Sequence, residues 1–195
     1  GLINIMYAFG LYMQNELVGI VTYGSPASQS LCKGIAGNKF KKIVLELNRL
    51  VLKNNIKNEA SFLVSNSFKL LPNPSIIVSY ADTGENHTGY IYQATNFIYT
   101  GLSEKRTEWK MKNSNKHSKT ICEQYTLKER KNNPDKFEVI DRSRKHRYIY
   151  IIGNKKDKKN IINKLKYPKL KYPKTPSEKY STNFNIPTQH ILDLI

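Results

Sequence analysis

Alternating apolar and polar residues predict two strands near the start of the chain. Phe9, Leu11 and Met13 alternate with other positions before a polar break, and a second apolar stretch follows over 17–21. A period of two is typical of half-buried strands, so we predict an antiparallel pair joined by a turn. The turn-forming residues at 24–26 end the second strand.

Between residues 43 and 82 the pattern changes from strand to helix and back to strand. An apolar-rich run at 43–52 predicts a third strand. Apolar residues at helical spacing follow over 60–71, with Asn58 as the expected N-cap. The continuous apolar run at 75–82 predicts a buried parallel strand.

The next segments extend this order by one helix and one strand. Residues 85–97 predict a short helix capped near Thr88, and residues 97–102 predict a strand. Two βα steps preceded by antiparallel strands indicate a mixed α/β sheet flanked by helices.

After Gly101 the chain has a different character. Residues 147–152 form one apolar-rich strand pattern among basic loops, and residues 166–180 are rich in Pro and Lys, as in extended surface segments. We therefore predict a core at 1–110 and a basic C-terminal extension at 111–195 that packs on it.

Charge is distributed unevenly between the two halves. The 195 residues include 32 Lys and Arg against 15 Asp and Glu, a net charge of +17. Residues 1–100 hold 8 basic and 5 acidic residues, whereas 101–195 hold 24 and 10. This asymmetry predicts a nucleic-acid partner bound mainly by the second half. The alternative is a lysine-rich composition that serves solubility or reflects an AT-rich genome.

Composition also indicates the cellular compartment of the protein. The two cysteines, Cys32 and Cys122, form neither a disulfide framework nor a CxxC metal site, which fits a reducing compartment. No apolar run approaches about 20 residues, and no signal peptide is visible. These features predict a cytoplasmic protein without a membrane partner. The strand pattern is already under way at the first residues, so we expect the natural chain to begin upstream.

Three stretches together resemble the Mom family of phage DNA-modification proteins. They read "LELNRLVL" at 45–52, "NEASFLVSNSFKLL" at 58–71 and "VSYADTGENHTGYIYQATNFIYTG" at 78–101. The shared features are an E-L-N-R-L strand, a helix opening on N-x-[AE]-S, a strand ending in Y-A-D, an N-H-x-G turn and the Y-Q-A-x-N-F-x-Y-x-G segment. The resemblance spans residues 6–101.

The resemblance implies a fold related to GNAT-type N-acetyltransferases. It also implies a transferase that modifies the N6 amino group of adenine in double-stranded DNA, in the host bacterial cytoplasm, and so protects phage DNA from restriction. Two alternatives stay open: an N-acetyltransferase for a small amine, a protein or RNA, and a non-catalytic DNA-binding protein.

The donor of the transferred group is not specified by the sequence. GNAT enzymes hold the acetyl-CoA pyrophosphate on an [RQ]-x-x-G-x-[GA] loop, whereas the equivalent "LKNNIKNEAS" at 52–61 contains no glycine. The amides at the helix start, from Asn58 to Ser61, still offer an anion site. Acetyl-CoA or another acyl or aminoacyl donor, and a metal requirement, remain open.

Three residues are candidates for proton transfer. Asp82 ends a buried strand, where open α/β sheets bind ligands, and it either orients or deprotonates an amine or caps a turn. His87, expected at a helix start, is a neutral base or a turn histidine bonded to backbone. Tyr92 is a general acid or a core aromatic. We predict no metal site because no HxxH or HxH pair accompanies His87.

Four residues are candidates for binding the donor. Ser61 opens the helix after the third strand together with Asn58, and its hydroxyl either binds the donor or caps the helix. Asn48 and Arg49 are neighbours on one strand and face opposite sides, so one of them should line the cleft.

The DNA-contact candidates combine basic and aromatic character. Contact with phosphate is the expected role, and a solvated loop is the alternative. An enzyme that reaches adenine N6 in duplex DNA would flip the base out, with Tyr23 or Trp109 as a stacking partner. The basic candidates are Arg142, Arg144, Lys145, His146 and Arg147, followed by Tyr148.

Overall fold

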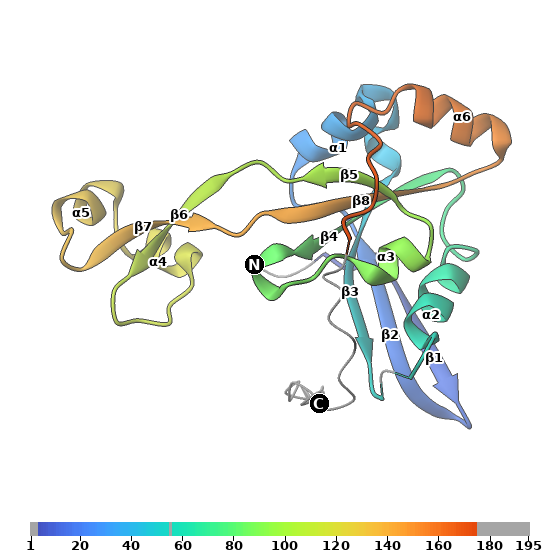
Figure 1. Ribbon diagram of the computed structural model, residues 1–195, viewed down its shortest axis with the longest axis horizontal. Helices are drawn as coiled ribbons and strands as arrows, with labels where there is room; N and C mark the ends of the chain where they lie inside the picture. Colours follow the sequence, from blue (N-terminus) through green and yellow to red (C-terminus); the bar gives the residue numbers. More distant parts are fainter. Residues whose placement is uncertain (1–3, 55, 175–195) are drawn as a thin grey trace.

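A six-stranded mixed sheet forms the centre of the protein, with the order β1-β2-β3-β4-β8-β5 (Figure 1). The structure, a computed structural model, describes residues 4–54 and 56–174. The strands are β1 (Tyr7–Met13), β2 (Glu16–Gly24), β3 (Val44–Leu52), β4 (Ser75–Asp82), β5 (Ile98–Leu102) and β8 (Lys145–Ile152). Helices flank this sheet, so the predicted mixed α/β architecture is confirmed.

The first three strands form an antiparallel meander. Gln14 and Asn15 connect β1 to β2 with positive φ angles of 49° and 66°. This two-residue turn matches the twist of the strands it joins. β3 then runs parallel to β4, with pairing from Val44–Ile76 to Glu46–Val78. Beyond these three positions the two strands diverge (Figure 1).

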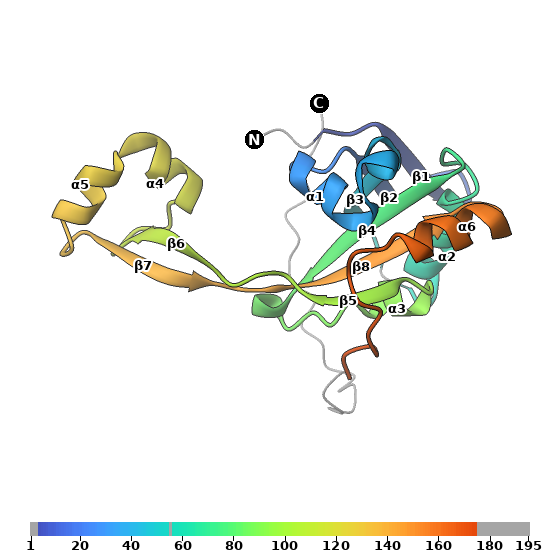
Figure 2. The same ribbon diagram turned by 90° about the horizontal axis from the view of Figure 1, so that it is seen from above.

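Helices cover both faces of the sheet and bury one core on each (Figures 1 and 2). α2 (Glu59–Ser67) and α3 (Tyr90–Ala94) lie on one face, while α1 (Gln29–Ala36), the 3-10 helix η1 (Asn38–Ile43) and α6 (Lys155–Asn163) lie on the other. The α2–α3 core includes Tyr23, Leu63, Val64, Ile77, Phe97 and Tyr148. The α1–α6 core includes Cys32, Ile35, Ile76, Val78, Ile149 and Ile161.

The two predicted N-caps lie at or next to the observed ones. Asn58 occupies the N-cap of α2 in the left-handed conformation, and its side chain makes no capping bond. The side chain that bonds to the backbone at this helix start is Glu59, whose carboxylate accepts the Ile56 amide at 2.9 Å. α3 begins at Tyr90 with Gly89 as N-cap, one residue after Thr88.

β8 comes from the part of the chain that the sequence analysis assigned to the extension. It lies between β4 and β5 and is antiparallel to both, so the sheet is incomplete without it. The chain therefore does not divide into a core and a separate extension at residue 110. Local patterns cannot reveal this, because β8 pairs with strands that lie far away in sequence.

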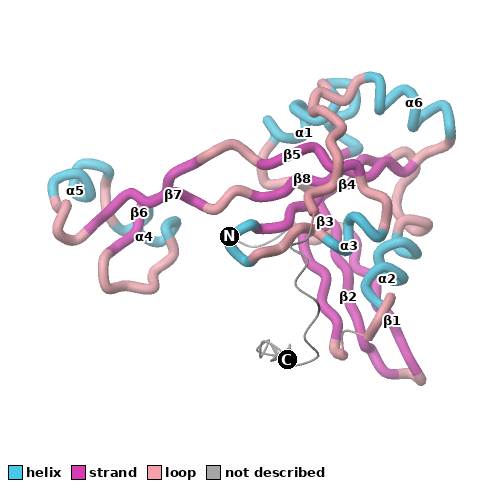
Figure 3. Tube along the Cα trace, viewed as in Figure 1, coloured by secondary structure: helices cyan, strands magenta, loops and turns pink. Residues whose placement is uncertain are grey.

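A projecting segment lies between β5 and β8, and we call residues 103–144 the arm. It consists of β6 (Arg106–Met111), α4 (Ser118–Gln124), α5 (Leu127–Asn132) and β7 (Phe137–Arg142). β6 and β7 form a separate two-stranded antiparallel sheet. The arm extends away from the six-stranded sheet in line with β5 and β8 (Figures 1 and 3).

The segment after α6 crosses the outer edge of β5. The Leu170 amide donates to the Tyr99 carbonyl at 2.9 Å, and the Tyr172 hydroxyl donates to the Phe97 carbonyl at 2.6 Å. Residues 164–174 contain no helix or strand, as predicted, and residues 175–180 of the predicted extended segment lie outside the described residues. Over the described part of the chain, no helix combines the length and the apolar character needed to cross a membrane.

Candidate active site

The divergence of β3 and β4 creates a site at their carboxyl ends, which we call the fork (residues 46–48 and 79–82). The last ladder pair is Glu46–Val78, followed by one side-chain bond from Ser79 Oγ to the Leu47 carbonyl at 3.1 Å. Carboxyl ends of parallel strands are where open α/β sheets bind ligands. Asp82 is the last residue of β4, so the predicted position at such an edge is confirmed.

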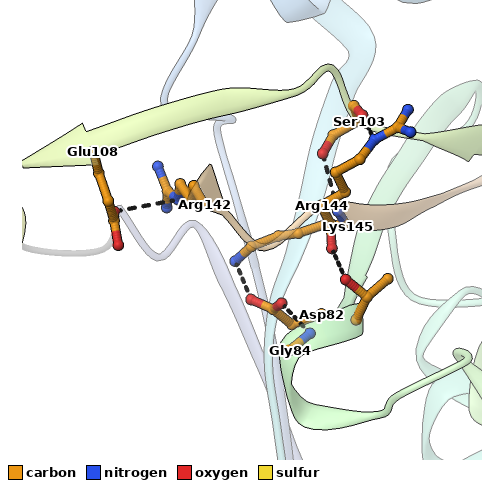
Figure 4. A network of polar contacts seen from close by, with 8 residues as sticks. Asp82, Gly84, Ser103, Glu108, Arg142, Arg144 and Lys145 are labelled. Carbon is orange, nitrogen blue, oxygen red and sulfur yellow. Dashed lines mark hydrogen bonds and ion pairs between the residues drawn. The ribbon is translucent and has the colours of Figure 1, made fainter. Parts of the chain in front are cut away.

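Asp82 is held in a dense set of polar contacts (Figure 4). Its Oδ1 accepts the Gly84 amide at 2.9 Å, and its Oδ2 lies 3.3 Å from Lys145 Nζ. Partial burial alone would raise the pKa of Asp82. Hydrogen bonds from Ser143, Gly84 and Lys145 outweigh burial and lower it. Asp82 is therefore an anion at neutral pH, suited to orienting a donor group more than to accepting a proton.

Glu46 lies on the same face of the sheet as Asp82 and has the opposite pKa shift. Ladder partners share a face, so Glu46 lies on the face of Val78, and Tyr80 and Asp82 follow on it at a period of two. Burial raises the pKa of Glu46, and the charge of Lys145 only partly offsets this. Burial likewise raises the pKa of Tyr80 to about 12. In the sequence, Glu46 was recognised only as part of the E-L-N-R-L strand.

Tyr92 approaches the fork from the other face. Its ring lies in the α2–α3 core, 5.2 Å from the rings of Phe97 and Tyr148. Burial raises its pKa, while a hydrogen bond with Ser79 lowers it by less. The phenol therefore keeps its proton at neutral pH. Asp82 and Tyr92 lie on opposite faces of the sheet. Side chains from the two faces come near each other at the fork, where β3 and β4 separate.

His87 does not lie at a helix start. It is in the exposed loop between η2 (Thr83–Glu85) and α3, three residues before the helix begins. α3 starts at Tyr90 and has only five residues, so its N-terminal dipole does not bear on His87. The His87 amide donates to the Asp82 carbonyl at 3.1 Å, which ties the loop to the end of β4.

Tyr99 and His146 form a pair beneath the root of the arm. The Tyr99 hydroxyl lies 2.8 Å from His146 Nδ1, and Tyr99 is 8% exposed. A scaffold role for Tyr99 fits this position. His146 is thus engaged within the protein, although the sequence analysis assigned it to DNA contact.

This pair predicts a pH-dependent component of stability. Burial lowers the pKa of His146 below 6.5, so the unfolded chain binds a proton at a higher pH than the native protein. The free energy of unfolding should therefore decrease as the pH falls from about 6.5 toward the native pKa. Denaturant unfolding at pH 7.5 and pH 5 should show a smaller decrease in His146→Asn than in wild type. Equal decreases in both proteins would contradict this prediction.

A groove between α2 and α3 contains the two predicted donor-binding residues of α2. It has a volume of about 380 Å³ and is lined by Asn58, Ser61, Phe62, Ser65, Phe68, Ala94, Thr95, Asn96 and Tyr150. Neither Asn48 nor Arg49 lines it. Asn48 accepts a bond from the Thr22 hydroxyl at 2.5 Å on the other face, and Arg49 is exposed.

The start of α2 does not fit the pyrophosphate of coenzyme A. In GNAT-type acetyltransferases, whose fold the family resemblance implies, backbone amides after the strand hold this group. Here the Glu59 carboxylate occupies that position, is 7% exposed and accepts the Ile56 amide. A second anion there would meet repulsion in a poorly solvated place. The Ser61 hydroxyl is also engaged, since it donates to the Asn58 carbonyl at 3.0 Å.

The predicted DNA-contact residues at 142–147 mostly bind other parts of the protein. The Arg147 guanidinium donates to Thr100 Oγ1 at 3.0 Å and lies 3.4 Å from the centre of the Tyr167 ring. Arg144 Nε donates to the Ser103 carbonyl at 2.6 Å (Figure 4). These residues hold the junction between the arm and the sheet. Arg142 is the exposed member, with a 3.8 Å ion pair to Glu108.

Of the two predicted stacking residues, Tyr23 is not placed to receive a flipped base. Tyr23 is fully buried and shares a hydrogen bond of 2.6 Å with Ser67. Trp109 lies in the arm under the Arg130 guanidinium, at 5.1 Å. Tyr23 is excluded because an inaccessible ring cannot stack on a base. Within residues 4–54 and 56–174, no three side chains of metal-binding type lie together.

Comparison with known proteins gives a family match over most of the chain. A family model described as the Mom protein family matches residues 2–174. Among solved structures, an N-acetyltransferase from Staphylococcus aureus Mu50 is similar at 13% identity with a TM-score of 0.41. That alignment covers 74% of this chain and 66% of the acetyltransferase. No curated protein gives a significant match.

Proposed function

The chain belongs to the Mom protein family, and from this membership we propose that it is a transferase that modifies the N6 amino group of adenine in double-stranded DNA. The family match over residues 2–174 carries the proposal, because it includes the fork and both of its faces. The modification would shield phage DNA from restriction enzymes in the bacterial cytoplasm.

We assign the two faces of the fork to the two substrates. The donor lies in the α2–α3 groove, on the face of Tyr92, with Asn58 and Ser61 at its rim. The adenine enters from the face of Asp82 and Lys145, where the arm begins. A sheet that opens only at the fork keeps the substrates apart until their reacting atoms meet there.

The proton transfers follow from the pKa shifts. The amino nitrogen loses a proton as it bonds to the donor, and Glu46 is the better acceptor because its raised pKa lies nearer neutrality. Anionic Asp82 accepts a hydrogen bond from the same amino group and orients it. Tyr92 keeps its proton and donates it to the leaving group. His87 lines the entrance as an exposed loop residue.

Mass spectrometry of nucleosides tests this proposal. DNA from cells that express the full chain should contain a modified adenosine that accumulates far more slowly in cells expressing an Asp82→Asn control. Unmodified adenine in every condition would overturn it. Acetyl-CoA turnover on a small amine would then favour an acetyltransferase, and salt-dependent DNA binding without any product would favour a non-catalytic protein.

Removing the Tyr92 hydroxyl should slow the reaction without unfolding the protein. Tyr92→Phe keeps the ring contacts with Phe97 and Tyr148, so only the proton donor is lost. We expect about a 10²-fold slower appearance of modified adenosine. Tyr90→Phe is the matched control, since Tyr90 is 63% exposed on the same helix. Equal rates for both variants would remove Tyr92 from the mechanism.

A further inference from the structure

The arm is a small folded unit on a two-stranded ribbon. α4 and α5 cover one face of the β6–β7 ribbon (Figure 2). Under them lies a small core in which Ile121 is fully buried, Phe137 is 3% exposed and the Tyr125 ring lies 4.9 Å from Phe137. The Arg130 guanidinium closes this core and donates to Cys122 Sγ at 2.9 Å. A projection with its own core is rigid enough to position a partner.

The root of the arm is bound to the end of β4. The Thr83 amide and hydroxyl both donate to the Arg144 carbonyl, at 3.1 and 2.8 Å. Lys145 adds its ion pair with Asp82, and its amide donates to Ser103 Oγ at 2.9 Å (Figure 4). Any macromolecule whose reactive group reaches Asp82 therefore lies beside the arm.

The ribbon face away from α4 and α5 carries side chains that can read base edges. Ladder pairing places six residues on it, because each pair shares a face and the faces alternate. Arg106, Lys110 and Arg142 on this face are exposed. The three pairs are Arg106–Arg142, Glu108–Ile140 and Lys110–Glu138. Arg and Lys recognise guanine, Glu recognises cytosine, and an apolar side chain contacts the thymine methyl.

The far end of the ribbon is strongly basic. Residues 110–119 read "KMKNSNKHSK", with four lysines, one histidine and no acidic residue. All four lysines are exposed. Such a segment is complementary to a phosphate backbone.

We propose that the uncovered face of the β6–β7 ribbon lies in the major groove of duplex DNA beside the target adenine, with the lysines of 110–119 on the adjoining phosphates. This proposal rests on the proposed function and names the element that selects the DNA sequence. The major groove admits a two-stranded ribbon and displays adenine N6. Duplex RNA is a poor substitute, because its major groove is too deep and narrow for side chains to read.

Duplex binding by the full chain tests the phosphate contacts. Lys112→Ala/Lys116→Ala should weaken binding to a mixed-sequence DNA duplex about tenfold at 150 mM salt and reduce the salt slope by about two. Lys156→Ala/Lys159→Ala on α6 is the matched control, since it removes equal charge from exposed positions far from the fork (Figure 1). Equal loss in both variants, or equal competition by duplex RNA, would overturn the proposal.

Sequencing of modified DNA tests the reading of bases. Arg106→Lys keeps the charge but loses the planar guanidinium group that can donate two hydrogen bonds to guanine. We expect near wild-type affinity and a relaxed preference at one base pair flanking the modified adenine. If the base preference around the modified adenine were unchanged in both Arg106→Lys and Arg106→Ala, the ribbon would not read the DNA sequence. Absence of any modified adenine in wild type would instead refute the proposed function, whereas the binding comparison would still decide the role of the arm.

Discussion

Replacing Asp82 by Asn is expected to lower the rate of adenine modification by about 10²- to 10³-fold. The substitution keeps a side-chain oxygen that can accept the Gly84 amide. It removes the negative charge that faces Lys145 and the incoming amino group. The measurement is the fraction of modified adenosine over time in DNA from cells that express each protein, with DNA affinity measured in parallel and expected to stay near wild type.

A second variant distinguishes a role of Asp82 in the reaction from a role in holding the arm in place. Thr83→Val removes the 2.8 Å bond from the Thr83 hydroxyl to the Arg144 carbonyl and leaves the carboxylate in place. We expect Thr83→Val to weaken DNA binding more than Asp82→Asn does, and to slow modification less at saturating DNA. If Thr83→Val slowed modification as much as Asp82→Asn, the role of Asp82 would be to position the arm.

Gly89→Ala is expected to destabilise the protein strongly. Gly89 has a φ of +76°, and a Cβ atom there would overlap Cε2 of the buried Tyr148 ring. Left-handed backbone costs about 1–2 kcal/mol for a residue with a Cβ, and overpacking of a core adds about 1–3 kcal/mol. We expect the free energy of unfolding to fall by about 2–5 kcal/mol in denaturant titration.

Gly37→Ala is a control without a steric contact. Gly37 has a φ of +87° and a ψ of 177°, and a Cβ atom added there would have nothing within 4 Å. Only the backbone cost of about 1–3 kcal/mol should appear there. A larger loss in Gly89→Ala would report the contact between position 89 and Tyr148. Equal destabilisation would show that the ring moves aside freely.

Local patterns were sufficient for the five strands of the first hundred residues and for α2 and α3, but not for α1 or η1. β1, β2, β3 and β4 are where periodicity predicts them, because a strand with one or two buried faces repeats its apolar residues at short range. The arm helices were missed. α4 and α5 hold few apolar residues, and Ile121 is the fully buried one in α4, so their sequence has no clear helical period.

The sequence by itself determined the architecture, the family and the position of Asp82 at the end of a buried strand, since each depends on residues close together in the chain. Tertiary structure alone decided three other features. It placed Asp82 and Tyr92 on opposite faces of the sheet, brought Lys145 to Asp82 across 63 residues, and engaged Arg144, His146 and Arg147 in contacts within the protein. Charge and residue type are properties of the sequence, but the partner of each charge depends on which strands pair, and β8 pairs only through contacts distant in sequence.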